Sequence, residues 1–153
     1  MSLIDSLKKL FSPAKQTSNE NRPEALKHSG DFSNFIAAKV VEWQKHPNAD
    51  RLRVVKLDVG DGKILDPIVC GASNFDNGDV VVLALPGAKI AQNIHSDAHE
   101  PFVLGKAKIR GIESQGMICA AFELGLSKEP GSGIMHLKPG TKPGSQFSPE
   151  MIE

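Results

Sequence analysis

Residues 67–88 read PIVCGASNFDNGDVVVLALPGA, which is two short apolar runs, each followed by residues that favour turns. Short apolar runs bounded by glycine, proline, asparagine and aspartate are typical of buried strands. The same pattern continues from Phe35 to near the end of the chain. It predicts an all-β domain of closed topology.

Seven strands are expected in this region. They span about 35–44, 51–59, 67–71, 80–85, 102–110, 116–119 and 133–137. Residues 123–126 read ELGL, which predicts one helical turn ended by Gly125. Gly71 closes the 67–71 run, where glycine permits a bend or a close backbone approach. If its backbone takes a conformation that other residues avoid, Gly71→Val destabilises the domain.

The N-terminal residues have a different pattern. Apolar residues at positions 3, 4, 7, 10 and 11 share one helical face, which predicts a short N-terminal amphipathic helix. Ser12-Pro13 ends it, and the polar residues up to Gly30 are typical of a flexible linker. The expected division is helix and linker at 1–30, β domain at 31–148 and tail at 149–153. The helix either folds back on the β domain or serves in docking or dimerisation.

The chain has 153 residues, 40% of them apolar, and a formal net charge of zero. That size allows one compact domain, and neutrality gives no overall attraction to nucleic acid or to a membrane. Any such attraction must come from a local patch. Because no long apolar run or secretory signal is visible, we expect a soluble, cytoplasmic protein without membrane partners. Cys70 and Cys119 lie within apolar runs, which predicts buried free thiols.

The strongest local charge pattern is Lys106-Ala107-Lys108-Ile109-Arg110. In a strand, the lysines and the arginine share one side, whereas Ala107 and Ile109 face the core. Like charges roughly 6 to 7 Å apart repel each other unless an anion compensates them. The row therefore indicates a surface for a polyanion such as a nucleic-acid backbone. The alternative is an exposed strand edge that lysines protect against aggregation.

A second group of cations flanks the turn at residues 46–50, which read HPNAD. Pro47 fixes its own φ, and the Asn and Asp side chains can bond to the neighbouring backbone, so the turn is stiff. A stiff turn holds the flanking Lys45, Arg51 and Arg53 at fixed positions, with the two arginines on one strand face. The alternative is that these arginines form an ordinary solvated face.

Signals for catalysis are weak. The sequence contains no phosphate-binding glycine loop, nucleophile elbow or helical histidine pair. The loop with His95, Asp97, His99 and Glu100 is a poor candidate for a metal site, because such groups in a loop are usually solvated. We therefore expect no catalytic residue, no cofactor and no metal. One tryptophan and no tyrosine argue against extensive base stacking and favour recognition by shape and phosphate.

Seven ordered blocks between Phe35 and Phe147 resemble a known family. They are KHPNADRL at 45–52, LDVG at 57–60, IVCGA at 68–72, LALPGA at 83–88, KAKIRGIES at 106–114, GMIC at 116–119 and ELGL at 123–126. On these blocks the chain is similar to the tRNA-binding OB-fold domain of the bacterial phenylalanyl-tRNA synthetase β subunit and of related free-standing proteins. The resemblance implies a five-stranded barrel that binds the structured body of tRNA with little sequence preference and without catalysis.

Carried over to this chain, the resemblance makes the basic residues the candidates for RNA contact. They are Lys106, Lys108 and Arg110, followed by Arg51, Arg53, Lys45 and Asn74. Asn74 either contacts the RNA through its amide or closes a turn. Two departures bear on affinity. Ala120 and Ala121 stand where the family commonly has Ser and Glu, and residues 89–101 form a longer connection than usual.

Three functions remain open on this basis. The first is a non-catalytic tRNA-binding module that recognises tRNA mainly through its phosphates. The second is the N-terminal tRNA-binding part of a phenylalanine-tRNA ligase β subunit, with the catalytic domains absent. The third is a chaperone-like or protein-interaction dimer that uses the same barrel. The expected partners are tRNA and, beyond it, an aminoacyl-tRNA synthetase or a second copy of the chain.

Overall fold

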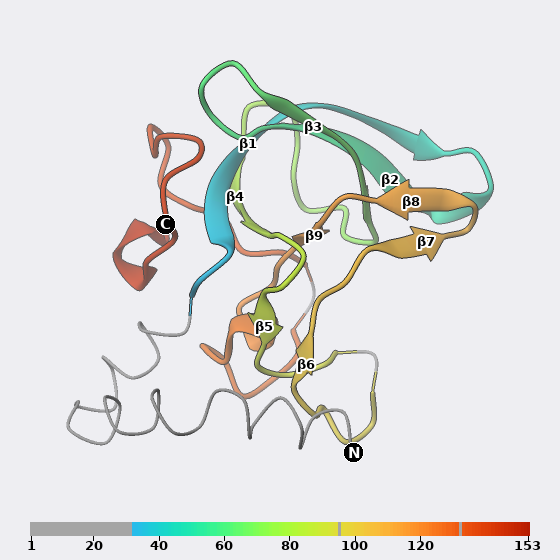
Figure 1. Ribbon diagram of the computed structural model, residues 1–153, viewed down its shortest axis with the longest axis vertical. Helices are drawn as coiled ribbons and strands as arrows, with labels where there is room; N and C mark the ends of the chain where they lie inside the picture. Colours follow the sequence, from blue (N-terminus) through green and yellow to red (C-terminus); the bar gives the residue numbers. More distant parts are fainter. Residues whose placement is uncertain (1–31, 95, 132) are drawn as a thin grey trace. The chain divides into compact units, whose positions relative to one another are not determined.

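The computed structural model describes residues 32–153 with the exception of 95 and 132, and the predicted N-terminal helix and linker lie outside this range. The described chain is all-β, as predicted, and its helical segments are two short 3-10 turns. Figure 1 shows a curved main sheet accompanied by two separate hairpins.

Five strands form the main antiparallel sheet, in the order β3-β2-β1-β4-β9. They are β1 (Phe35–His46), β2 (Ala49–Asp58), β3 (Ile64–Cys70), β4 (Val80–Ala84) and β9 (Met117–Ile118). The central strand β1 pairs with both β2 and β4. Its register with β2 shifts twice, once between Val40 and Glu42 and once between Lys45 and His46. Such irregularities bend a strand, which lets the long β1–β2 pair curl.

Two apolar clusters share the side chains of β1 and β4. Ala37 and Val82 lie in one cluster, whereas their sequence neighbours Ala38 and Val81 lie in the other. Successive side chains of a strand point to opposite faces, so both faces are buried along β4 and along the first part of β1. The second cluster collects side chains from all five strands of the main sheet. One sheet must curl to bring five strands onto a common core.

The first cluster is covered by the rest of the chain. The covering elements are the hairpin of β5 (Lys89–Ile90) and β6 (Phe102–Val103), the turn η1 (Phe122–Leu124) and the C-terminal segment. The predicted helical turn is confirmed, because η1 ends at Gly125 with a φ of 76°. The turn η2 (Pro149–Met151) follows at the end of the chain. There Ile152 pairs with Leu137, so the last residues pack on the domain.

The two edges of the main sheet approach each other. Strand β3 lies against β8 (Ile112–Ser114) and β9. The backbone N–H of Gln115 donates to the Pro67 carbonyl at 2.9 Å, and the N–H of Val69 donates to the Ser114 hydroxyl at 2.9 Å. No ladder joins β3 to β9 in the described chain. The structure therefore shows a curled five-stranded sheet whose edge strand β3 is bonded to the residues just before β9, and it does not show the expected closed barrel.

The prediction of a single strand at 102–110 is wrong. Strand β6 pairs with β5, and the new strand β7 (Ala107–Ile109) pairs with β8. The pairing with the first hairpin ends at Leu104, whose N–H donates to the Ala88 carbonyl at 2.8 Å. One continuous alternation of apolar and polar residues thus covers two strands that pair with different neighbours. The spacing of the residues alone does not show where the pairing changes.

The strand expected at 133–137 is also wrong. This segment forms isolated bridges only, between His136 and Val81 and between Leu137 and Ile152. Gly133 has a φ of 105°, which lies outside the β region. The backbone therefore bends where the apolar pattern begins, and no regular strand forms.

Cys70 and Cys119 are buried and free, as predicted. Burial raises the pKa of both thiols, and that of Cys119 lies well above its usual value. The nearby Glu123 carboxylate adds to both increases. In the described part of the chain, no helix has the length and hydrophobicity needed to cross a membrane.

Candidate nucleic-acid interface

Two basic elements meet at one end of the main sheet: the β1–β2 turn and the hairpin of β7 and β8. His46 lies between them with 3% of its surface exposed, and its Nδ1 accepts the backbone N–H of Asn48 at 3.0 Å. Because Nδ1 is an acceptor, Nε2 carries the hydrogen and donates to the Ile109 carbonyl at 3.1 Å. Asn48 Nδ2 also donates to the Arg110 carbonyl at 3.4 Å. These bonds fasten the hairpin to the turn.

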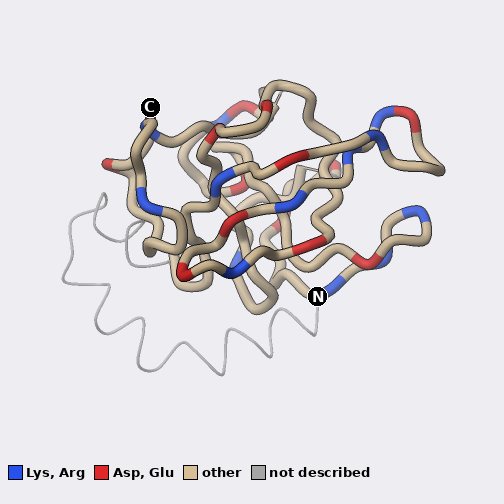
Figure 2. The backbone as a smooth tube through the Cα atoms, turned by 90° about the horizontal axis from the view of Figure 1, so that it is seen from above, with Lys and Arg blue, Asp and Glu red and all other residues tan. Residues whose placement is uncertain are grey.

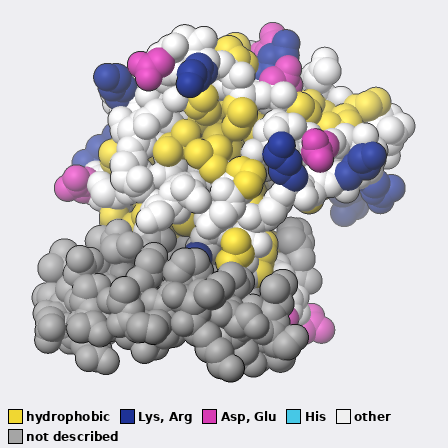
Figure 3. All heavy atoms as spheres, viewed as in Figure 1, with side chains coloured by type: hydrophobic (Ala, Val, Ile, Leu, Met, Phe, Trp, Pro, Cys, Tyr) yellow, Lys and Arg dark blue, Asp and Glu magenta, His cyan; other side chains and the backbone are white. Residues whose placement is uncertain are grey.

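We call this surface the cationic end. Its exposed cations are Lys45, Arg51, Lys106, Lys108 and Arg110. Figure 2 shows lysine and arginine positions, with acidic positions among them, on two neighbouring loops at one side of the domain, and Figure 3 shows dark-blue side chains projecting there. Lys45 Nζ lies 3.9 Å from Asp50 Oδ1. The three cations of the hairpin form no ion pair with any described residue, although Glu113 lies opposite Lys108 in the β7–β8 register.

The hairpin cations depart from the predicted row. Only Lys108 lies within β7, because Lys106 precedes the strand and Arg110 occupies the turn. Arg110 and Gly111 have φ values of 52° and 93°, as in the two-residue turns that join twisted strands. Ala107 is exposed, so the expected buried apolar face is absent. The cations thus project from a two-stranded hairpin rather than from a face of the main sheet.

Arg53 of β2 is held by its neighbours. Its guanidinium carbon lies 3.5 Å from the centroid of the Trp43 ring and 4.8 Å from that of Phe75. Its Nη1 donates to the Phe75 carbonyl at 2.7 Å. Trp43 is fixed in turn, because its Nε1 donates to Asp76 Oδ1 at 3.1 Å. Bonds from the Asn77 backbone N–H and from Trp43 hold the pKa of the Asp76 carboxyl below its usual value.

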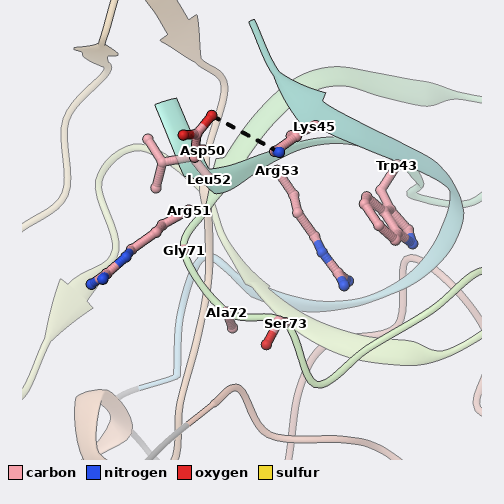
Figure 4. A pocket seen from close by; sticks show the side chains of 9 residues that line it. All are labelled: Trp43, Lys45, Asp50, Arg51, Leu52, Arg53, Gly71, Ala72 and Ser73. Atoms are coloured by element: carbon pink, nitrogen blue, oxygen red, sulfur yellow. Dashed lines mark ion pairs between the residues drawn. The ribbon is translucent and has the colours of Figure 1, made fainter. Parts of the chain in front are cut away.

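A pocket of about 590 Å³ opens between β1, β2 and the residues that follow β3 (Figure 4). Arg51 and Arg53 both line it, as expected for residues two apart on a strand, and their side chains diverge in Figure 4. Trp43 and Lys45 line it from β1, and Ser73 adds a hydroxyl from the opposite side. Aromatic, cationic and hydrogen-bonding groups therefore surround one hollow.

Gly71 lies at this pocket and is exposed. It is not among the described residues with positive φ. A Cβ added to it would contact only Leu52 Cδ2, at 3.5 Å, which is an ordinary van der Waals distance. The backbone constraint expected at Gly71 is therefore absent, and the structure gives no reason for Gly71→Val to unfold the domain.

Asn74 has a structural role. Its Nδ2 donates to the Ile134 carbonyl at 3.0 Å, and its Oδ1 accepts the Ile134 N–H at 2.9 Å. Its own carbonyl lies 2.7 Å from His136 Nε2. Of the two roles open for Asn74, these bonds support the local structural one, because they tie the loop after β3 to the segment around Ile134.

Trp43, His46 and Asn48 are important in this site, but they are not among the predicted RNA-binding residues. Trp43 shares its strand face with Lys45, so the period of two offered a signal for it. His46 offered none, because its partner Ile109 lies 63 positions along the chain. Among the described residues, no group of three or more His, Cys, Asp or Glu side chains is placed to hold a metal ion.

A curled five-stranded sheet with cations projecting at one end is the arrangement of a small nucleic-acid-binding β domain. The family model described as "Putative tRNA binding domain" matches residues 35–146. The chain belongs to this family.

The curated relatives are ligase subunits. The chain is 42% identical over 123 residues to the phenylalanine–tRNA ligase beta subunit of Anaeromyxobacter dehalogenans, a match that covers 80% of this chain and 14% of the relative. It is 47% identical over 113 residues to the same subunit of Burkholderia pseudomallei, covering 74% of this chain and 14% of the relative. The chain thus corresponds to a small part of these subunits.

Solved structures share the fold. A "MetRS related protein" from Pyrococcus horikoshii aligns with a TM-score of 0.51 at 15% identity, covering 74% of this chain and 88% of that one. The C-terminal domain of Plasmodium vivax p43 aligns with a TM-score of 0.50 at 24% identity, covering 78% of this chain and 62% of that one. At these identities the likeness concerns the fold.

Proposed function

We propose that this chain is a non-catalytic module that binds the structured body of tRNA through the cationic end. The observation that carries the proposal is the pair of basic elements fastened together by His46, with three exposed hairpin cations that form no ion pair with a described residue. The proposed phosphate contacts are Lys106, Lys108, Arg110 and Arg51. Membership of the tRNA-binding family supports tRNA as the polyanion.

The other candidates have lesser roles in this proposal. The exposed Lys45 Nζ lies 3.9 Å from Asp50 Oδ1, a weak ion pair that a phosphate must displace, and the guanidinium of Arg53 is already engaged by Trp43 and Phe75. An engaged cation still adds to the local positive potential, but it has less freedom to follow a phosphate. Asn74 is held by the backbone of Ile134, so we place it outside the contact surface.

We also propose that the curled sheet is an OB-fold barrel that begins near residue 31. The hydrogen bonds from Gln115 to Pro67 and from Val69 to Ser114, which join β3 to the residues just before β9, support this view. The apolar cluster formed by side chains of all five strands supports it as well. The helix and linker proposed for 1–30 would then precede a complete module.

The setting of the module is part of the proposal. In the curated relatives the matched region belongs to a phenylalanine–tRNA ligase beta subunit. This chain would act either within such a subunit or as a free-standing protein that assists a synthetase in trans, in the cytoplasm. Pairing of two copies is a further option that a mass measurement in solution would decide.

The test is tRNA affinity measured over a range of salt concentrations. Displacement of counterions makes the logarithm of the association constant fall linearly with the logarithm of salt, by about 0.9 for each phosphate that a duplex-like surface contributes. Replacing Lys106, Lys108 and Arg110 together with alanine should reduce this slope by up to about 3 and weaken binding roughly 10- to 100-fold at low salt.

A matched control removes the same charge elsewhere. Lys63, Lys138 and Lys142 are exposed, and their loops lie together near Gly60 and Pro143, at the other end of β2. Their triple alanine variant should bind tRNA nearly as tightly as the unmodified chain. Equal affinities of the two triple variants would place the site elsewhere. A binding constant that hardly responds to salt would favour the protein-interaction function instead.

A further inference from the structure

We propose that the pocket beside the cationic end holds one unpaired nucleotide together with its phosphate. This inference rests on the proposed tRNA-binding function and adds to it a defined subsite with a defined chemistry. Its volume of about 590 Å³ lies within the range of small-molecule sites, roughly 300 to 1,000 Å³.

One wall of the pocket is suited to a planar base. Trp43 and Arg53 are stacked at 3.5 Å, and each is held by the protein, Trp43 through Asp76 and Arg53 through the Phe75 carbonyl. The Arg53 guanidinium also lies 4.8 Å from the centroid of the Phe75 ring, so a base packs against a wall that the protein already holds in place, which lowers the entropy cost of binding. The wall therefore acts as a pre-formed platform beside the base.

The same hydrogen bonds indicate that this wall does not distinguish one base from another. The indole N–H of Trp43 and one N–H of Arg53 already have protein acceptors. Stacking is tolerant of base identity because every base has a flat face, whereas discrimination needs free donors and acceptors at the base edge. The platform should therefore accept any of the four bases with little preference.

The rim of the pocket is suited to a phosphate. Lys45 and Arg51 stand there with exposed side chains, and Ser73 offers a hydroxyl donor. Asp50 is the opposing charge, at 3.9 Å from Lys45, with 95% of its side chain exposed. At that distance and exposure the ion pair is weak, so a phosphate can replace the Asp50 carboxylate as the partner of Lys45. Charge-assisted bonds from Arg51 and Lys45 would then fix the nucleotide.

Gly71 supplies an independent argument for a ligand. The fold does not require glycine there, because its φ is not positive and an added Cβ meets only Leu52 at an ordinary distance. Glycine within a strand often marks a place where a ligand or another backbone approaches closely, and Gly71 directly follows β3. Here the glycine leaves open the pocket that a side chain would narrow.

The nucleotide chemistry has two possible sources, an unpaired position of tRNA and a free nucleotide. The pocket is continuous with the cationic end, because Lys45 and Arg51 belong to both, and this favours tRNA as the source. An RNA strand that follows the cations of the hairpin would reach the pocket without leaving the positive surface. The free nucleotide is the other arm of the test.

Trp43 is the single tryptophan of the chain, so its fluorescence reports directly on the pocket. Titration with tRNA and, separately, with each nucleoside 5′-monophosphate should change this fluorescence in a saturable way. Gly71→Val should fold with unchanged thermal stability and bind tRNA about 5- to 100-fold more weakly, the range for the loss of one stacked base. Gly105→Val, at an exposed glycine with open space around it, is the control and should bind normally.

The outcomes separate this inference from the proposed function. If Gly71→Val is folded and binds tRNA as the unmodified chain does, the subsite is wrong and tRNA binding stands. The unmodified chain could fail to bind tRNA while nucleoside monophosphates quench Trp43 fluorescence and Gly71→Val abolishes the quenching. The pocket would then be a site for free nucleotides. If Gly71→Val fails to fold, Ser73→Glu places a negative charge at an exposed position of the same rim, and unchanged tRNA affinity there overturns the inference.

Discussion

Replacing His46 with alanine should loosen the cationic end. The ring is 3% exposed and makes two hydrogen bonds, to the Asn48 N–H at 3.0 Å and to the Ile109 carbonyl at 3.1 Å. Each lost bond costs about 1 kcal/mol. Loss of the packed ring adds about 1 kcal/mol or slightly more. We therefore expect the free energy of unfolding to fall by about 2 to 4 kcal/mol, which lowers Tm by roughly 8 to 15 °C for a domain of this size.

Urea unfolding monitored by Trp43 fluorescence measures the stability, and amide hydrogen exchange locates the change. The N–H groups that pair β7 with β8 should exchange faster in His46→Ala, because the hairpin then has fewer bonds to the rest of the domain. The core strand β4 should keep its relative protection, since all of its residues are buried away from the substitution.

Asn48→Ala is the matched control. It keeps the backbone N–H that bonds to Nδ1 of His46 and removes only an exposed contact of 3.4 Å to the Arg110 carbonyl. Its cost should stay below about 0.5 kcal/mol, as for most surface substitutions. A loss below that same limit for His46→Ala, with unchanged exchange in the hairpin, would show that the histidine does not fasten the two elements together.

Two further predictions concern strain and thiol reactivity. Arg110 has a positive φ that asparagine adopts more readily, so Arg110→Asn should raise stability by about 0.5 to 1 kcal/mol in urea unfolding while it weakens tRNA binding. Cys70 and Cys119 should react slowly with a thiol reagent at pH 8 until urea unfolds the chain, because their raised pKa values keep both thiols protonated. Since the folded pKa values exceed the unfolded value of 9.0, the thiols should lower stability only as the pH rises above about 9.

Much of the fold could be predicted from local pattern. Strand pairs that bury both faces, such as β1 and β4, appear as apolar runs between turn residues, and the structure confirms their positions within a few residues. The failures occur where a strand changes partner, at Leu104 to Lys106, and where a glycine bends an apolar run, at Gly133. Local pattern records which residues are apolar but does not show which neighbour each run will pair with.

The candidate site was predictable in composition but not in arrangement. The sequence locates the cations, and Lys106, Lys108 and Arg110 are exposed as expected. It does not show that a buried histidine joins their hairpin to a turn 63 positions away, or that Arg53 is stacked on Trp43. Such contacts depend on how the sheet curls, and this is settled by packing across the whole core.

The electrostatics of the chain explain why a fixed arrangement matters here. A molecule with zero net charge exerts little long-range pull on tRNA, because fields from its separate charges cancel and salt screens them beyond about 8 Å. Binding must then come from contacts made at short range, where placement decides how many phosphates are met at once. The bonds of His46 fix the position of the hairpin. Arg110 stands at the tip of the hairpin although its positive φ costs about 1 kcal/mol or more. In the proposed function, phosphate contacts made by the tip arginine would offset this strain, and the bonds of His46 would hold the same arginine in place.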